Sequence, residues 1–320
     1  MRKMFKIISV SMCSVLIIIC VLIVIIFVNH RINLSKENKD FIPNGQMVNV
    51  NGYNMHIYTE GDGDIPLVFM AGGGTSSPTL DFKSLYTLLS DKYKIVVIEK
   101  FGYGFSDVVN TPRDVESILN DTRKALSLAN IKGPYVLFPH SISGIEALYW
   151  AQQYPKEIKG IVGLDMAVPE AYENYKINIP MIKIGAIASK LGVTRLIPSL
   201  SESDAIKYGT LTDNEKKLYK TIFYRRTATS TMIDEVIEVK NNANKVSKIS
   251  MPDIPVLMFV SNGVDTGWNE TDWRNIQETT IDKFQNGEIV YLDCSHYVHD
   301  IEYKKIAESS ISFIKQIETN

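Results

Sequence analysis

From residue 46 onward, short apolar segments typical of buried strands alternate with segments of helical periodicity. Residues 46–62 predict a hairpin, because Asn51-Gly52 is a favoured pair for a two-residue turn. Six more strand-like segments follow, at 65–72, 94–100, 134–140, 160–166, 254–262 and 288–293. Alternation of this kind is typical of a sheet with helices on both faces. The sequence therefore predicts an α/β domain with a mostly parallel, eight-stranded sheet.

The alternation stops between residues 169 and 250, where helical periods continue without a strand-like segment. We therefore expect a core domain formed by residues 46–168 and 251–320, with residues 169–250 inserted as a helical cap. The segment Met181–Val193 within the insertion is strongly apolar. We expect it to cover a cleft and to shape a pocket for an acyl chain.

Residues 7–28 form an uncharged apolar run, and about 20 such residues are needed for a helix to cross a bilayer. The alternative is a cleaved signal peptide, whose apolar stretch is usually shorter and ends in small residues. This run ends in Ile-Ile-Phe-Val, so we expect an uncleaved transmembrane anchor. Residues 1–6 form a tail before it, and the polar residues 29–45 form a linker after it.

The sequence indicates the orientation in the membrane less clearly than the presence of the span, because Lys and Arg are equally frequent on the two flanks of the run. The short, basic tail favours a cytoplasmic N-terminus. We therefore expect a single-pass protein of the cell membrane with its large domain outside. The low cysteine content of that domain suits a bacterial surface protein better than a disulfide-rich secreted one.

Composition narrows the possible partners. The formal net charge is -2, which does not favour nucleic acid. Two of the 3 Cys lie in the apolar run, and no His/Cys spacing resembles a zinc site. We expect neither a cofactor nor a metal.

The strongest candidate for chemistry is Ser141. It follows the strand-like segment 134–140 and precedes a helical segment, in the order Pro-His-Ser-Ile-Ser-Gly. Ligands of open α/β sheets bind beyond the carboxyl ends of the strands. A serine on a tight strand-to-helix turn presents its hydroxyl there, next to N–H groups that can stabilise an oxyanion. The alternative is that Ser141 or Ser143 only caps the helix.

A nucleophilic serine needs a base and an orienting carboxylate. His296 and His299 follow the last strand-like segment, and we favour His296 with His299 as the alternative. Asp165 and Asp265 each end or follow a strand-like segment between the serine and these histidines. The residues themselves leave the choice between the two carboxylates open.

A second oxyanion donor is expected in the loop after residues 65–70. Three consecutive glycines, residues 72–74, let the backbone approach the cleft and offer N–H groups without side chains. A flexible loop or a phosphate cradle is the alternative, although the Lys-Ser/Thr of a P-loop does not follow.

Several of these segments together resemble the α/β-hydrolase superfamily over about residues 46–317. They are LVFMAGGG, VVIEKFGYGFSD, FPHSISG and CSHYVHDIEYKKIAESSISFI. The resemblance implies that Ser141 is the nucleophile, that His296 is the base, and that Gly73 and Ile142 supply the oxyanion N–H groups. The chain departs from the family pattern at Pro139 and Ser143, which flank Ser141, and at Ser295 and Tyr303 near the end.

The segment GLDMAVPEAY resembles a subgroup whose acid follows the sixth strand, which favours Asp165 over Asp265. The resemblance implies a serine hydrolase but does not fix its substrate. From the apolar insertion and the triad residues we expect a small hydrophobic carboxylic ester or related acyl compound. A peptidase acting on small N-terminal peptides, or an amidase, is the alternative within this fold. A membrane-bound relative that binds without turnover is the alternative outside enzymes.

Overall fold

The structure is a computed structural model that describes residues 2–319. Its centre is one eight-stranded sheet with the order β1-β2-β4-β3-β5-β6-β7-β8. β1 and β2 pair antiparallel, β2 pairs antiparallel with β4, and every other pairing is parallel. The strands are β1 (Gln46–Val50), β2 (Tyr53–Glu60), β3 (Pro66–Met70), β4 (Lys94–Glu99), β5 (Tyr135–Pro139), β6 (Ile158–Leu164), β7 (Val256–Val260) and β8 (Gly287–Tyr291). The mostly parallel, eight-stranded sheet that the sequence predicts is confirmed.

The hairpin between β1 and β2 shows how closely local sequence determines this part of the fold. Asn51 and Gly52 both adopt positive φ, at 55° and 93°. Two consecutive positive φ angles are the requirement of the tight turn that Asn-Gly favours. The turn sets the register in which Val50 pairs with Tyr53.

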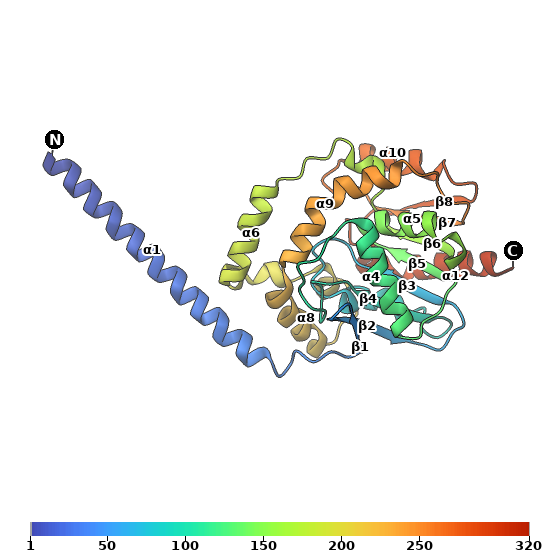
Figure 1. Cartoon of the computed structure of the whole chain (residues 1–320), viewed down its shortest axis with the longest axis horizontal. Helices are drawn as coiled ribbons and strands as arrows, with labels where there is room; N and C mark the ends of the chain where they lie inside the picture. The colour runs from blue at the N-terminus through green and yellow to red at the C-terminus, as the bar shows by residue number, and fades with distance from the viewer. Residues whose placement is uncertain (1, 320) are drawn as a thin grey trace.

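Alternate side chains of each buried strand enter one of two hydrophobic clusters, one on each face of the sheet. Helices α4 (Val115–Leu128), α5 (Ser143–Gln153) and α10 (Glu270–Ile281) cover one face. Helices α3 (Lys83–Tyr86) and α12 (Tyr303–Thr319) cover the other. The short elements α2 (Pro78–Asp81), η1 (Pro155–Glu157) and α11 (Val298–Ile301) complete the core. The sheet therefore lies between helical layers on both sides (Figure 1).

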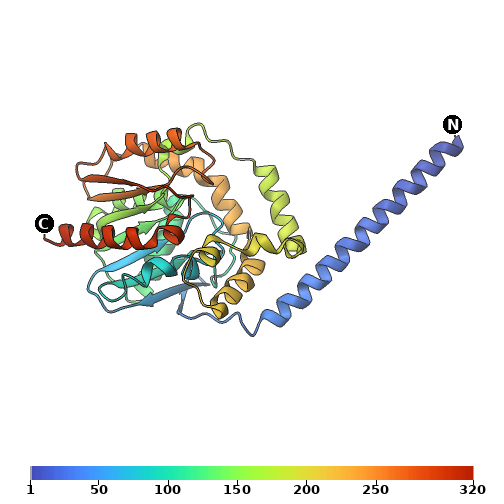
Figure 2. The same cartoon turned by 180° about the vertical axis from the view of Figure 1, so that it is seen from behind.

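The segment between β6 and β7, where a cap is expected, consists of helices and loops. Its elements are η2 (Pro169–Tyr172), α6 (Ile179–Leu191), η3 (Val193–Leu196), η4 (Pro198–Ser201), α7 (Asp204–Lys207), α8 (Asp213–Arg226) and α9 (Ser230–Ser247). Helix α9 packs on η2 and on α5, whereas α6 lies farther from the sheet (Figures 1 and 2).

The N-terminal helix α1 (Arg2–Glu37) is long and apolar enough to cross a membrane, a property that an N-terminal signal sequence shares. It continues beyond residue 28, so the first part of the expected linker is helical. Packing explains this continuation. His30 is buried against Gly192, and Arg195 forms an ion pair with Glu37 at 2.7 Å. Helix α1 projects from the side of the molecule where α6 lies (Figures 1 and 2).

Candidate active site

Ser141 lies on the turn between β5 and α5, at the carboxyl edge of the parallel strands. Its φ is +53°, a left-handed conformation that is uncommon for a residue with a side chain. The turn is held from behind, because the Ser141 carbonyl accepts hydrogen bonds from the N–H groups of Gly144 at 2.9 Å and Ala167 at 2.8 Å. The backbone thus fixes Ser141 in the strained position that a strand-to-helix nucleophile requires.

The structure accommodates the two departures from the family pattern on either side of Ser141. Pro139 is the last residue of β5, and pairing with β3 continues beyond it through a hydrogen bond of 3.0 Å from the His140 N–H to the Met70 carbonyl. Ser143 is buried, and its hydroxyl lies 2.6 Å from the Met70 carbonyl oxygen. A Cβ on Gly144 would lie 2.2 Å from the Ala167 carbonyl oxygen. Close packing therefore requires glycine at position 144, one place after its usual position.

His296 and Asp165 lie in contact. Asp165 follows β6, His296 follows β8, and His296 Nδ1 is 2.5 Å from Asp165 Oδ2. This hydrogen bond leaves Nε2 of His296 as the ring nitrogen that can receive a proton. The loop that carries His296 is fixed by its own N–H, which donates to the Val264 carbonyl at 3.0 Å. The structure thus brings together two of the three residues of the predicted triad by a direct bond.

Asp165 is fully buried and accepts three hydrogen bonds from elsewhere. Ser261 donates its N–H at 2.7 Å and its hydroxyl at 2.8 Å, and the Trp273 indole N–H donates at 2.8 Å. These donors compensate for burying the carboxylate and orient it towards His296. Sequence reasoning missed both partners. Trp273 in particular lies on α10, and only the fold brings it to β6.

The alternative residues lie in different places. Asp265 is exposed on the loop after β7, and no hydrogen bond joins it to His296 among residues 2–319. His299 is buried with its Nε2 3.2 Å from Asp81 Oδ2. His140 is buried as well, and its Nε2 donates to the His296 carbonyl at 3.2 Å. Burial, with the nearby His296 and His299, lowers the pKa of His140 well below its usual value, so this ring stays neutral.

The two backbone groups expected to stabilise an oxyanion also lie together. Gly73 is in the turn after β3, and a Cβ built on it would be 3.4 Å from Cγ2 of Ile142. Ile142 directly follows Ser141 at the start of α5. Within residues 2–319, neither N–H donates a hydrogen bond to another protein group. Both groups are therefore available to an oxygen atom of a ligand.

Ser141, His296 and Gly73 line one cavity of about 230 Å³. Its other walls are mainly aromatic and come from the start of the cap and from the loops after β7 and β8: Tyr172, Tyr175, Trp268, Trp273 and Tyr297, with Ala167, Ala171, Asp265 and Thr266 completing the lining. The candidate nucleophile and base thus line the same small cavity.

The expectation that Met181–Val193 shapes the acyl pocket is wrong. No residue of this segment lines the cavity, and Met181, Ile184 and Ile187 are 61%, 60% and 60% exposed. The residues that bound the cavity from the cap are Tyr172 and Tyr175, which precede α6. Hydrophobicity alone could not tell whether this helix covers the cleft or faces outward.

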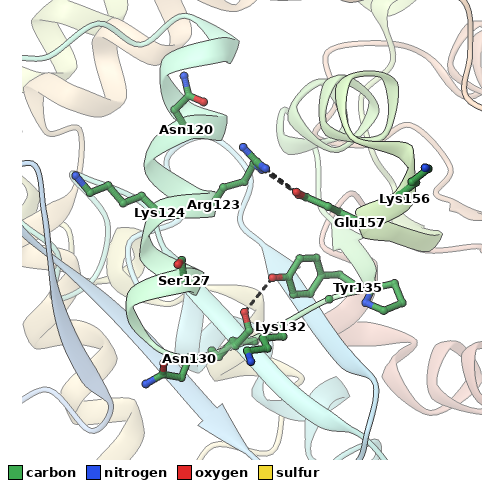
Figure 3. Close-up of a pocket in the computed structure, with 12 residues that line it drawn as sticks. Asn120, Arg123, Lys124, Ser127, Asn130, Lys132, Tyr135, Lys156 and Glu157 are labelled. Carbon is green, nitrogen blue, oxygen red and sulfur yellow. Dashed lines mark hydrogen bonds and ion pairs between the residues drawn. The ribbon is translucent and has the colours of Figure 1, made fainter.

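A larger hollow of about 720 Å³ lies elsewhere, between α4, the start of β5 and η1 (Figure 3). It is at the opposite end of β5 from Ser141. Its Arg123 is held by Glu157 through an ion pair, with the Nε–Oε2 bond at 2.9 Å, and Tyr135 donates to the Ile131 carbonyl (Figure 3). Its lining residues include no histidine or cysteine, so they offer no nucleophile–base pair of the kind found around Ser141.

Comparison with known proteins identifies the family of the fold. A family model described as the alpha/beta hydrolase fold matches residues 65–302. The chain belongs to the α/β-hydrolase fold family. An uncharacterized protein of Bacillus subtilis, YbdG, is 33% identical over 99% of this chain and 100% of its own length.

Solved structures extend the likeness of the fold. An esterase from Thermogutta terrifontis superposes with a TM-score of 0.66 at 14% identity, over 85% of this chain and 99% of the esterase. A loop variant of a haloalkane dehalogenase from Bradyrhizobium elkanii superposes with a TM-score of 0.62 at 14% identity, over 86% of this chain and 97% of the dehalogenase. These likenesses concern the fold, which hosts different reactions, so they identify no particular reaction for this chain.

Proposed function

We propose that this protein is a serine hydrolase that cleaves a small carboxylic ester through an acyl-enzyme on Ser141. The observation that carries the proposal is the shared cavity. A serine in a strained strand-to-helix turn lines it together with a histidine whose other ring nitrogen is 2.5 Å from a buried carboxylate. A histidine on the surface or a serine that only caps a helix would not require this arrangement.

The reaction then follows from the roles of these groups. His296 Nε2 takes the proton of the Ser141 hydroxyl as Oγ attacks the ester carbonyl carbon. The N–H groups of Ile142 and Gly73 stabilise the oxyanion, and the loss of one such donor costs about 3–4 kcal/mol in comparable sites. The alkoxide leaves with the proton from His296. Water then attacks the acyl group, gives its proton to His296, and releases the acid as Ser141 regains its hydrogen.

The cavity favours a short substrate. Its volume of about 230 Å³ is below the range of roughly 300–1,000 Å³ typical of sites for drug-sized ligands. Tyr and Trp side chains are among its lining residues and can pack against an acyl or alkyl group of a few carbons. We therefore expect activity on p-nitrophenyl esters to fall as the acyl chain lengthens from acetate or butyrate.

A fluorophosphonate probe tests the nucleophile directly. The full-length protein should be labelled, and labelling should be lost in Ser141→Ala but kept in Ser127→Ala, which changes an exposed serine on α4. Well-folded wild-type protein that resists labelling and hydrolyses no ester would contradict the proposal. It would support instead a binding protein without turnover.

A peptidase is the second candidate, and one observation favours it. Asp265 lines the cavity with an exposed carboxylate, which could pair with the amino group of a short peptide. Aminoacyl p-nitroanilides and simple esters separate the two activities. If Asp265 binds an ammonium group, Asp265→Asn should raise KM for the anilides and leave KM for the esters unchanged.

We infer also that α1 is an uncleaved anchor and that the hydrolase domain lies outside the cell membrane. The support is the uncharged apolar run of residues 7–28, which is longer than the apolar stretch of an ordinary signal peptide and ends in bulky residues. The full chain should remain in membranes washed with alkaline carbonate. Added protease should degrade the hydrolase domain on intact, wall-free cells. Release by the wash would contradict the anchor, and protection from protease would contradict the orientation.

A further inference from the structure

A second group of ionisable side chains lies outside the residues used above. It consists of Asp81, at the end of α2, and His299 and Asp300 in α11. All three side chains are 0% exposed. Each offers one ligand atom, and these atoms lie within 4.8 Å of one another. Only the fold brings these residues together, because Asp81 is far from the other two in the sequence.

Asp300 is the unusual member of the group. Both of its carboxylate oxygens are buried, and neither has a hydrogen-bond partner among the protein groups of residues 2–319. Nδ1 of His299 is also buried without a partner. Buried polar groups are almost always hydrogen-bonded, and an isolated buried carboxylate is costly. The side chain of Asp300 thus lacks the donors that Ser261 and Trp273 give to Asp165.

The charges around Asp300 increase the free-energy cost of burying its ionised carboxylate. The ionisable groups that act on its carboxyl are Asp81 and Asp204, both of them acids. The nearest ammonium to Asp204 is paired with it, because Lys207 Nζ lies 3.7 Å from Asp204 Oδ1. A buried cluster of acids requires protons, hydrogen-bond donors or a cation to compensate it.

The geometry favours a cation. Nε2 of His299 is 3.2 Å from Oδ2 of Asp81, which is long for a charge-assisted hydrogen bond of about 2.7–2.9 Å. Two ligands bound to one ion at about 2.0–2.2 Å lie roughly 3.0–3.4 Å apart in tetrahedral or octahedral geometry. In addition, Tyr219 donates its hydroxyl to the other oxygen of Asp81 at 3.0 Å. Such outer hydrogen bonds are typical of carboxylates that bind metals.

We propose that Asp81, His299 and Asp300 bind one divalent metal ion, and that Zn²⁺ is the ion this set of carboxylate and imidazole donors fits best. The ion would neutralise the two carboxylates and give Asp300 a partner. Nothing in the sequence spacing indicates this site, because two ligands are adjacent in α11 and the third precedes them by more than half the chain.

The site would join the loop that carries the candidate base to the rest of the core. His299 is three residues after His296, and the ring of His140 lies 4.6 Å from each of them, centroid to centroid. A metal here would fix α11 against α2. We therefore expect the ion to stabilise the fold and the position of His296, and not to contact the substrate.

The test uses full-length protein purified in detergent without a histidine tag. The protein is treated with a chelator, incubated with Zn²⁺ or Mn²⁺, desalted, and analysed for metal content and thermal unfolding. The wild type should retain about one Zn²⁺ per chain, with a higher unfolding temperature than the chelated protein. Asp300→Asn should lose both effects, whereas Asp293→Asn, a change of an exposed acid near His296, should keep them.

The wild-type result decides the proposal even if Asp300→Asn does not fold. A wild type that retains no metal, with an unfolding temperature insensitive to Zn²⁺ and Mn²⁺, would overturn it. In that case Asp300→Asn should simply be more stable than the wild type, because it removes an uncompensated buried acid. Equal metal retention by Asp300→Asn and the wild type would place the ion elsewhere and would also overturn the assignment. Retention of Mn²⁺ with loss of Zn²⁺ would contradict the choice of ion.

Discussion

Asp165 differs from Asp265 in its contacts, and this difference predicts a difference in function. Asp165 accepts the His296 hydrogen bond, while Asp265 is exposed at the edge of the cavity. We expect Asp165→Asn to lower kcat by about 10³–10⁴-fold, because an amide no longer holds the imidazole in the required tautomer. Asp265→Asn should change kcat for esters by less than about threefold.

Ester hydrolysis under saturating substrate measures both variants, with fluorophosphonate labelling as a second readout. A loss of turnover in Asp265→Asn, with Asp165→Asn close to wild type, would reverse the assignment of the acid.

The glycine after the nucleophile turn gives a prediction about stability. A Cβ at Gly144 would overlap the Ala167 carbonyl oxygen at 2.2 Å, and backbone cannot move aside easily. We expect Gly144→Ala to lower the free energy of unfolding by about 1–3 kcal/mol. Gly185, in the middle of α6, has nothing within 4 Å of the same position. Gly185→Ala should therefore raise the free energy of unfolding by up to about 1 kcal/mol, as expected for alanine in an open helix position.

Denaturant unfolding of both alanine variants in the same detergent compares them directly. If Gly144→Ala is as stable as the wild type, the close packing of α5 against the loop after β6 does not explain the displaced glycine.

At the scale of elements, a buried charged cluster connects β4, α5 and the cap. Lys100 lies 2.5 Å from Glu146 and also forms an ion pair with Glu235 on α9. Two buried carboxylates share the Lys100 ammonium, and this arrangement favours the retention of a proton on one of them. Burial and the neighbouring Glu235 raise the pKa of Glu146 to about 7, against an ordinary value of 4.5. Glu146 is therefore the residue expected to hold that proton.

This raised pKa predicts how stability changes with pH. The folded state binds the proton of Glu146 more tightly than the unfolded state does, so its contribution is complete below pH 4.5 and is lost as the pH rises through about 7. Glu146→Gln removes that dependence. We expect the free energy of unfolding of the variant, relative to the wild type, to increase between pH 5 and pH 8 by at most on the order of 3 kcal/mol.

Urea unfolding at several pH values measures the difference between the two proteins. A difference that is constant across this range would show that Glu146 does not hold the proton.

The elements whose position the sequence predicts correctly are those in which residue type alone indicates burial or a turn. β5 and β7 are apolar at every position, and Asn51-Gly52 can form one kind of turn. Contacts between residues that are far apart in the chain could not be predicted from residue type. The contacts of Trp273 with Asp165 and of Asp81 with His299 join segments that only the folded sheet brings together. Likewise, the pattern of α6 indicated an apolar helix without indicating what its apolar face meets.

At the scale of the whole molecule, the exposed apolar side chains are concentrated where the chain leaves α1. Beyond α1 itself, they include three residues of α6 and, just after it, Leu196, Ile197 and Leu200. An apolar patch of this kind on a soluble surface usually marks a contact with a partner or a membrane. Helix α1 contacts both α6 and η3, and α1 and α6 lie on the same side of the molecule (Figures 1 and 2).

An anchored chain would therefore hold the apolar face of α6 at the bilayer surface. Lys183 and Lys190 lie on the same helix and can reach lipid headgroups, as in other interfacial helices. The chain passes from the aromatic cavity wall at Tyr172 and Tyr175 directly into α6. The wall of the cavity is thus joined to the helix that would rest on the bilayer.

Depth-dependent quenching tests the position of α6 in the full-length protein. In a chain whose three natural cysteines are replaced, Ile184→Cys is labelled with an environment-sensitive dye and reconstituted into vesicles containing nitroxide lipids. We expect its emission to shift to the blue and to be quenched by the nitroxide, because the labelled side chain lies among lipid tails. Leu128→Cys, 44% exposed at the end of α4, is the matched control and should stay unquenched. Equal emission and quenching at the two positions would mean that α6 faces water, and that the anchor holds the hydrolase domain away from the bilayer.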